Sequence, residues 1–264
     1  KLIIFMVQYQ RIFIMIGEKM MFVNQNADAY DRETEEYIVA YLDLLGVTNR
    51  IKDYSQDELS MNKLHNLYTF SMSIMKEIQI EENKDIRFKI FSDNIIIAKK
   101  ISSDLEQRKK DIKSLLRCTG HFQELAASDS VGWMLRGGVA IGQLYIDEVM
   151  VWGKALLTAY ELEDKVANYP RVIIDEDVVN EISSVQDLQE YLRLDFDGLY
   201  YLNYLADCHF CGRMLMQGFE IMKKEVGYTY NERLKQKFLW HMKFVNDELD
   251  RKNEKKDIKY RLSM

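Results

Sequence analysis

From residue 36 onward, apolar residues follow strand-like and helix-like patterns in turn. Residues 36–43 (EYIVAYLD) are β-branched and aromatic, as in a buried strand. Leucines and isoleucines between residues 59 and 78 recur at helical spacing, which predicts a long amphipathic helix. Residues 86–91 and 95–98 form two short strand patterns, and the Ser-Asp-Asn between them favours a tight turn.

The same alternation continues through the middle of the chain. Apolar residues at helical spacing predict a helix over 105–125, and residues 154–167 predict another. Between them, residues 134–141 and 144–152 read as two strands separated by Gly142-Gln143. After Pro170 a smaller mixed stretch precedes helical patterns over about 212–251.

This order of elements predicts the fold class. Strand, helix, hairpin, helix, strand pair and helix make an antiparallel or mixed sheet with helices on one face, the α+β class related to the ferredoxin-like split βαβ unit. We therefore divide the chain into an apolar N-terminal segment and lead-in (1–35), a core domain (36–174) and a mixed, then helical, C-terminal extension (175–264).

The N-terminal segment is the most apolar part of the chain. Residues 2–16 (LIIFMVQYQRIFIMI) are interrupted by two glutamines and Arg11. A spanning helix needs about 20 mostly apolar residues, and a signal peptide needs a basic start and a small-residue cleavage site. Our hypothesis is that residues 1–19 are an appendage upstream of the natural start, and we expect no stable membrane insertion.

Composition narrows the function classes. The chain has 264 residues, 47% of them apolar, and a single proline, which excludes a disordered or collagen-like chain. A net charge of −6 argues against a nucleic-acid partner, since neutralising phosphates needs a basic surface. Three cysteines make no disulfide framework, so we expect a cytoplasmic protein. Cys208 and Cys211 form a lone Cys-x-x-Cys, without the second pair of a structural zinc site.

Candidate chemistry lies at the strand ends. Strand alternation places Tyr37, Tyr41 and Asp43 on one face, and Lys89 and Asp93 likewise share a face. The two aspartates are suitable ligands for Mg²⁺ or Mn²⁺ if their strands are neighbours. Aspartates are also ordinary residues of strand-end turns, and spacing alone favours that alternative.

Four local motifs, in order, resemble those of the class III nucleotidyl cyclases. Residues 43–48 (Asp-Leu-Leu-Gly-Val-Thr) resemble the family's Asp-Ile-x-Gly-Phe-Thr signature, and 91–94 (Phe-Ser-Asp-Asn) its second metal-binding hairpin. Residues 135–142 (Leu-Arg-Gly-Gly-Val-Ala-Ile-Gly) are similar to its Arg-x-Gly-Ile-x-x-Gly strand. Residues 151–163 are similar to its Val-x-Gly-x-x-Val-Asn-x-Ala-x-Arg-Leu segment.

The chain also departs from the family pattern. The family's transition-state Asn falls on Leu157 and its Arg on Glu161, while a position that often reads adenine is Met150. Retained metal aspartates with altered purine-contacting positions resemble the pyrimidine cyclases of bacterial Pycsar anti-phage systems. The resemblance implies that residues 36–174 are a nucleotidyl cyclase catalytic domain making cyclic UMP or cyclic CMP from UTP or CTP.

The resemblance also implies a site and its cofactors. Two divalent cations, Mn²⁺ or Mg²⁺, would be held by two carboxylates and a main-chain carbonyl, and the loop after the first aspartate would receive the phosphates. The implied residues are Asp43, Leu44 and Asp93 for the metals; Leu45, Gly46, Val47 and Thr48 for the phosphates; Arg136 and Lys154 for phosphate neutralisation; and Tyr37, Tyr41 and Lys89 near the base.

Class III sites form between two chains, so the resemblance implies a homodimer with sites at its interface. A pyrimidine cyclase of this kind acts through a separate cyclic-nucleotide-binding effector. Two alternatives stay open. Loss of the Asn and Arg positions suits a catalytically inactive binding or scaffold module, and Lys89, the adenylyl-cyclase residue type, suits an adenylyl cyclase.

Overall fold

The computed structural model describes residues 3–7, 11–16, 19–24, 32–47, 57–82, 85–207, 212–227 and 231–253. The chain divides into two compact units, Lys1–Thr34 and Glu35–Met264. The smaller unit is an antiparallel sheet of β1 (Ile3–Val7), β2 (Arg11–Ile16) and β3 (Lys19–Asn24). The apolar N-terminal run therefore forms strands. Within the described ranges, no helix is both long and apolar enough to cross a membrane.

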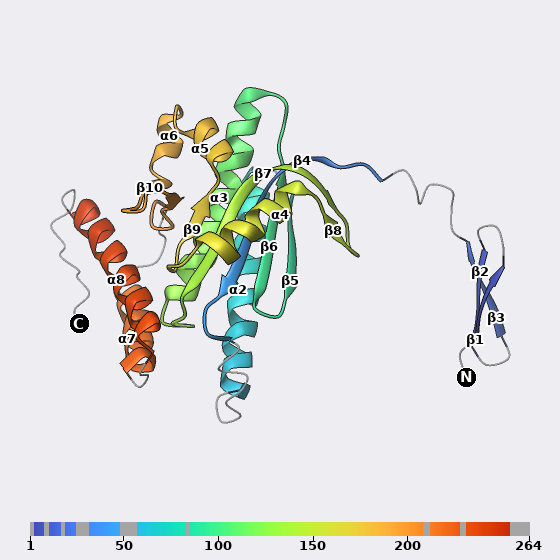
Figure 1. Cartoon of the computed structure of the whole chain (residues 1–264), viewed down its shortest axis with the longest axis horizontal. Helices are drawn as coiled ribbons and strands as arrows, with labels where there is room; N and C mark the ends of the chain where they lie inside the picture. Colours follow the sequence, from blue (N-terminus) through green and yellow to red (C-terminus); the bar gives the residue numbers. More distant parts are fainter. Residues whose placement is uncertain are drawn as a thin grey trace. The chain divides into compact units, whose positions relative to one another are not determined.

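The larger unit is built on the predicted strand–helix–hairpin–helix–strand order (Figure 1). Its four central strands lie antiparallel in the order β7-β4-β6-β5, the arrangement of a ferredoxin-like unit. The elements are β4 (Glu35–Leu44), α2 (Asp57–Glu82), β5 (Ile86–Phe91), β6 (Asn94–Lys100), α3 (Leu105–Ala127) and β7 (Leu135–Ile146).

Further strands extend this sheet beyond β7. The strand β9 (Val172–Ile174) pairs with β7 in parallel, and β11 (Tyr200–Leu202) and β10 (Leu192–Leu194) follow antiparallel. The short β8 (Val151–Trp152) pairs with the end of β7. Helices α5 (Glu176–Ile182) and α6 (Gln186–Gln189) lie between β9 and β10 in the chain. This mixed sheet with covering helices and C-terminal helices confirms the α+β prediction.

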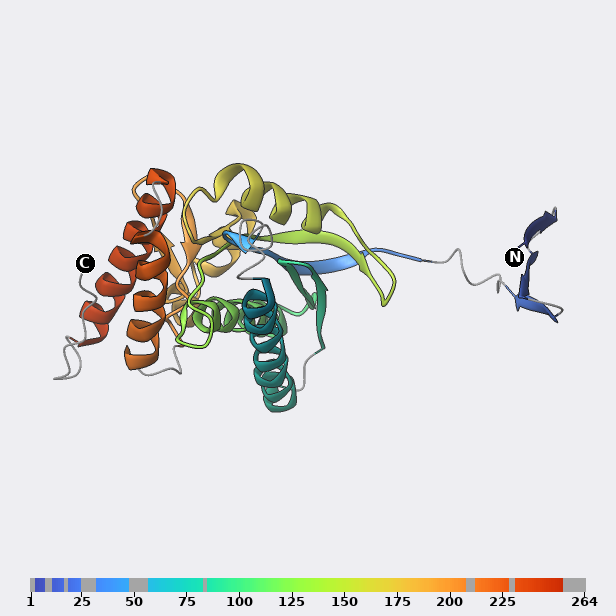
Figure 2. The same cartoon turned by 90° about the horizontal axis from the view of Figure 1, so that it is seen from below.

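Helices cover both faces of the sheet, so the prediction of helices on one face is wrong. Along β4, Ile38 and Leu42 are buried in the same cluster as Leu67 of α2 and Leu115 of α3. Val39 points the other way, toward α4 (Lys154–Glu161). Figure 2 shows α4 on one side of the sheet and α2 and α3 on the other. The continuous apolar run of β4 already indicates helices on both faces, because apolar and polar residues do not alternate in a strand that is buried on both sides.

The predicted separation of two strands at Gly142-Gln143 is also wrong. β7 runs unbroken through both residues, and the chain turns later, where the Asp147 carboxylate accepts hydrogen bonds from the amides of Val149 and Met150, both at 2.8 Å. A Cβ on Gly142 would lie 3.4 Å from the amide nitrogen of Ala155. This is ordinary van der Waals contact, whereas a Cβ on Gly138 would lie 2.3 Å from the Ala159 carbonyl oxygen, so α4 approaches the sheet most closely at Gly138. The predicted helix over 154–167 becomes α4 followed by a π-helical turn, η2 (Leu162–Val166).

The helical part of the C-terminal extension contains α7 (Gly212–Gly227) and α8 (Glu232–Asn253). Their apolar residues share one cluster with β9, β11 and the end of α3. Beside that cluster, the fully buried guanidinium of Arg171 forms ion pairs with Asp195 and Asp197 and lies over the rings of Tyr169 and Trp240. Trp240 belongs to α8, so this group of contacts joins the helix to the sheet region.

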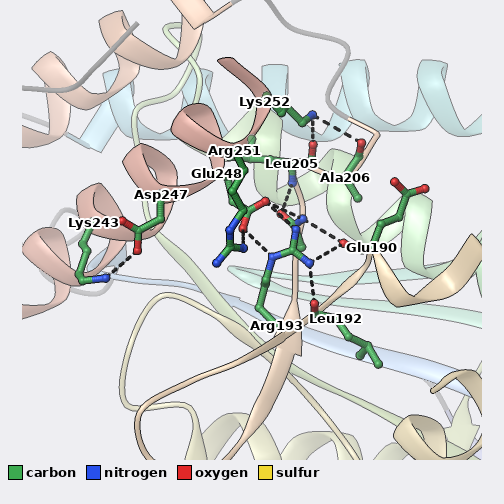
Figure 3. A network of polar contacts seen from close by, with 11 residues as sticks. Glu190, Leu192, Arg193, Leu205, Ala206, Lys243, Asp247, Glu248, Arg251 and Lys252 are labelled. Atoms are coloured by element: carbon green, nitrogen blue, oxygen red, sulfur yellow. Dashed lines mark hydrogen bonds and ion pairs between the residues drawn. The ribbon is translucent and has the colours of Figure 1, made fainter. Parts of the chain in front are cut away.

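A second polar network fixes the far end of α8 (Figure 3). Glu248, which is 2% exposed, accepts hydrogen bonds from Arg193 of β10 at 2.7 Å and from the Asn203 amide at 3.1 Å. Lys252 donates to the main-chain carbonyls of Leu205 and Ala206. The middle of the helix and its C-terminal end are thus tied to different parts of the same core.

Candidate active site

The two predicted aspartates lie on neighbouring strands at one end of the sheet. Asp43 of β4 is directly opposite Asn94 of β6. Ser92 and Asp93 form the two-residue turn between β5 and β6, which confirms the predicted tight turn. The amide of Leu44 donates to the main-chain carbonyl of Asp93 at 3.3 Å. This contact ties the end of β4 to the hairpin and brings the two carboxylates to the same edge.

The hairpin turn is held from both sides. Ser92 has a φ of 56°, a left-handed conformation that suits two-residue hairpins. The Tyr68 hydroxyl of α2 donates to the Ser92 carbonyl at 2.6 Å, and the Tyr41 hydroxyl of β4 donates to Oδ1 of Asn94 at 2.6 Å. The position of Asp93 is therefore fixed by side chains from two other elements.

Arg136 joins Asp43 to a third carboxylate. It lies opposite Asp43 on β7, and its Nε donates to Oδ2 of Asp43 at 3.2 Å. Its Nη2 lies 2.7 Å from Oε1 of Glu163, which is 4% exposed in η2. Glu163 is not among the site residues that the sequence predicts. Its place at the end of the fourth motif was the only signal for it.

Burial is the largest influence on the pKa values of the titratable side chains around Asp43. It raises the pKa of Asp43 above its ordinary value, although the nearby Arg136 guanidinium acts in the opposite sense. Burial likewise raises the pKa of Glu163 to about 7, against the attraction of Arg136. The pKa of Tyr41 rises to about 12, first through burial and then through the charges of Glu163 and Asp43. The Tyr41 hydroxyl therefore keeps its proton and serves as a donor.

A lysine from the C-terminal extension belongs to the same electrostatic group. Lys237 of α8 is half-buried, and burial together with the charge of Arg136 lowers its pKa, whereas Asp43 and Glu163 raise it. No local pattern marks this lysine, because the tertiary fold alone brings α8 to this end of the sheet.

The predicted phosphate loop is only partly described. Gly46 has a φ of +88°, a conformation that favours glycine, and Val47 is buried. The amide of Leu45 donates to the Met134 carbonyl at 2.9 Å, so it is already used within the chain. Thr48 lies outside the described residues, as do Cys208 and Cys211.

Other predicted site residues lie away from this edge in the same chain. Tyr37 is 6% exposed and sits in the apolar cluster beneath α4. The Lys89 ammonium donates to the main-chain carbonyl of Glu148 in the turn before β8. Lys154 is exposed at the start of α4, next to Ala155, which approaches Gly142. The opposite end of that helix leads to Glu163. The structure thus brings together Asp43, Asp93 and Arg136, but not Tyr37, Lys89 or Lys154.

The donor set at this edge suits a hard divalent cation. Among the described residues, only Arg136 donates to the Asp43 carboxylate, through Oδ2, so Oδ1 stays available to a cation. Within the same part of the chain, no group of three or more His, Cys, Asp or Glu side chains is placed to hold a metal. A cation here would therefore need oxygens of the main chain and the substrate, as Mg²⁺ commonly does.

Comparison with known proteins gives likenesses of structure. The sequence matches no protein-family model and no curated protein. The structure is similar to the adenylyl cyclase CyaB from P. aeruginosa (14% identity, 65% of this chain and 95% of that chain, TM-score 0.45). It is also similar to the guanylyl cyclase domain of the RhoGC fusion protein from Blastocladiella emersonii (14% identity, 65% of this chain and 96% of that chain, TM-score 0.48). A third similar structure is that of the guanylate cyclase domain of RhGC from Catenaria anguillulae in complex with GTP (12% identity, 65% of this chain and 98% of that chain, TM-score 0.42). At these identities and TM-scores, none of them assigns an activity to the chain.

Proposed function

We propose that this chain is a class III nucleotidyl cyclase that converts UTP or CTP to the 3′,5′-cyclic monophosphate and pyrophosphate. The observation that carries the proposal is the convergence of Asp43 and Asp93 at adjacent strand ends, tied by the hydrogen bond from Leu44 to Asp93. The cyclase-like order of the four motifs, with altered purine-contacting positions, supports a pyrimidine substrate. The product would be a second messenger in anti-phage defence.

The reaction is an intramolecular displacement at phosphorus. The ribose 3′-oxygen attacks the α-phosphorus, the new O3′–P bond forms, the bond to the bridging oxygen breaks, pyrophosphate leaves, and the 3′-proton passes to solvent. Two divalent cations, when bound, would lower the pKa of the 3′-hydroxyl and balance the charge of the pyrophosphate.

The chain's own residues would hold and orient these groups. Asp43, Asp93 and the Leu44 carbonyl are the proposed cation ligands. Arg136 orients Asp43 by holding Oδ2, which leaves Oδ1 toward the cation. Gly46, in its left-handed conformation, turns the chain without a side chain, and so gives the phosphates room near the main chain.

The proposed enzyme is a cytoplasmic homodimer whose sites lie between its chains. Lys89 and Lys154 lie away from Asp43 within one chain, as expected if the partner chain supplies them to a shared site. The proposed product acts on a separate cyclic-nucleotide-binding effector.

A catalytically inactive binding module is the second candidate. Leu157, at the family's Asn position, is 57% exposed and has no polar side-chain atom. Arg136 already bridges two carboxylates in the absence of substrate. A module of this kind would keep the fold and bind a nucleotide without turning it over.

One assay separates these candidates and the adenylyl-cyclase alternative. Purified protein is incubated with Mn²⁺ and each of the four nucleoside triphosphates, and products are identified by mass spectrometry, with a chelator-treated sample as control. Cyclic UMP or cyclic CMP is the expected product. Cyclic AMP would show an adenylyl cyclase, and no product from any of the four would support the inactive module.

A further inference from the structure

The candidate site is short of positive charge within its own chain. Arg136 is divided between Asp43 and Glu163. The family's arginine position is Glu161, whose carboxylate pairs with the Lys165 ammonium at 2.7 Å. A triphosphate brings several negative charges to an edge that already holds three carboxylates, so its binding needs cationic groups besides the metal ions.

The helix α8 places a lysine beside this edge. Leu234 and Phe238, which flank Lys237, belong to the same apolar cluster as Leu45 and Leu162. Leu45 follows the end of β4 and Leu162 precedes Glu163. The cluster joins this part of α8 to the residues that adjoin Asp43 and Glu163 in the chain. The charges of these two carboxylates act on the Lys237 ammonium group.

Lys237 differs from the other described lysines of α8. Lys235, Lys243 and Lys252 have an acidic partner or a main-chain acceptor. Among the described residues, Lys237 forms no hydrogen bond and no ion pair within 4.0 Å. An ammonium group that is partly removed from water and lacks a direct partner gains more from an incoming anion than an exposed lysine does.

We propose that Lys237 binds the phosphate chain of the substrate, so that the C-terminal extension supplies part of the active site. This inference rests on the proposed function and names a phosphate-binding residue outside the four motifs. The anchoring of α8 by Arg193–Glu248 and by the stacked Tyr169 and Trp240 rings fixes the helix that carries Lys237 before the nucleotide arrives.

The test measures binding of tripolyphosphate in the presence of Mg²⁺ by isothermal titration calorimetry. We expect Lys237→Gln to weaken binding by about tenfold, the usual effect of losing one charge-assisted hydrogen bond. Lys237→Arg should restore most of the affinity. Lys243→Gln, on the same helix but exposed and paired with Asp247, removes the same charge and should bind like the wild type. Circular dichroism and thermal midpoints of all three variants check the fold.

The inference and the proposed function can fail separately. Equal affinity in Lys237→Gln and wild type, or a wild type that does not bind tripolyphosphate, would overturn the role of Lys237. An equal loss in Lys243→Gln would show a general charge effect and overturn it too. If the wild type binds tripolyphosphate through Lys237 but converts none of the four nucleoside triphosphates, the cyclase proposal fails and the phosphate site stands.

Discussion

Asp43 and Asp93 share an edge of the sheet but have different surroundings. Asp43 lies between Arg136 and Asn94 on the flanking strands, whereas Asp93 occupies a turn shaped by Ser92. Neither carboxylate supports the apolar core. The proposed cation site therefore predicts that their removal affects activity more than folding.

Replacing either aspartate should separate activity from stability. We expect Asp43→Ala and Asp93→Ala to lower turnover more than ~100-fold, because even outer partners of metal ligands are worth about 10–100-fold. Thermal midpoints should stay close to that of the wild type. Asp85→Ala, at an exposed position just before β5, is the matched control and should keep full activity. Normal turnover in either site variant would rule out the metal assignment.

Individual residues differed in how well the sequence could reveal them. Strand alternation and the Ser-Asp-Asn turn placed Asp43 and Asp93 at strand ends, because both effects act over a few residues, and the resemblance of the surrounding motifs singled them out as candidate ligands. Glu163 and Lys237 reach the site through an irregular turn after α4 and through a helix far along the chain. The periodicity of a single sequence does not show which residues from distant elements come together in the folded chain.

The contact of α4 with the sheet depends on a glycine of β7. A Cβ on Gly138 would come within 2.3 Å of the Ala159 carbonyl oxygen, whereas one on Gly142 would meet nothing closer than 3.4 Å. We expect Gly138→Ala to destabilise the fold by roughly 1–3 kcal/mol, because helix and strand must move apart. Gly142→Ala, the same change on the same strand, should cost less than about 0.5 kcal/mol. Urea unfolding of the two variants measures the difference, and equal losses would contradict the close packing.

The same packing explains which elements the sequence predicted well. The long helices α2 and α3 and the strands β4 to β6 follow clear periodicities, and their predicted positions agree with the structure to within a few residues. Gly142-Gln143 predicts a break between two strands, but a glycine can also lie inside a continuous strand, and the residue type alone does not distinguish the two. In the structure β7 continues through both residues.

The attachment of the C-terminal helices makes stability depend on pH. His241 of α8 is buried beside Tyr204, whose hydroxyl lies 2.9 Å from Nε2, and burial lowers its pKa to about 3. Below the unfolded pKa of about 6.5, the unfolded chain binds a proton that the folded chain refuses. Folded stability therefore falls as the pH drops from about 6.5 toward 3, by about 1.4 kcal/mol per pH unit from this group.

Comparing urea unfolding at about pH 7.5 and about pH 5.5 tests this linkage. His241→Gln should lose less stability than the wild type over that interval, by about 1.4 kcal/mol. His65→Gln, at an exposed position of α2, should follow the wild type. If His241→Gln has the same pH dependence as the wild type, the histidine is not held neutral in the folded protein.

The assembly of the whole molecule decides whether Lys154 can act in catalysis. It lies at the start of α4, whereas the end of that helix leads to Glu163 beside Asp43. In a symmetric dimer with shared sites, one chain would supply Asp93 and its partner would supply Lys154. Asp93→Ala and Lys154→Ala should therefore each be inactive alone.

Mixing these two variants should restore activity. Random exchange makes half of the dimers mixed, and each mixed dimer has one site with both residues intact, so about a quarter of wild-type turnover should return. Asp93→Ala mixed with Asp43→Ala is the control, because both changes affect the same half of the site and no intact pair forms. Recovery in the first mixture alone would establish sites shared between chains. No recovery in either mixture, despite proven subunit exchange, would contradict sites shared between chains, and normal activity of Lys154→Ala alone would exclude Lys154 from the site.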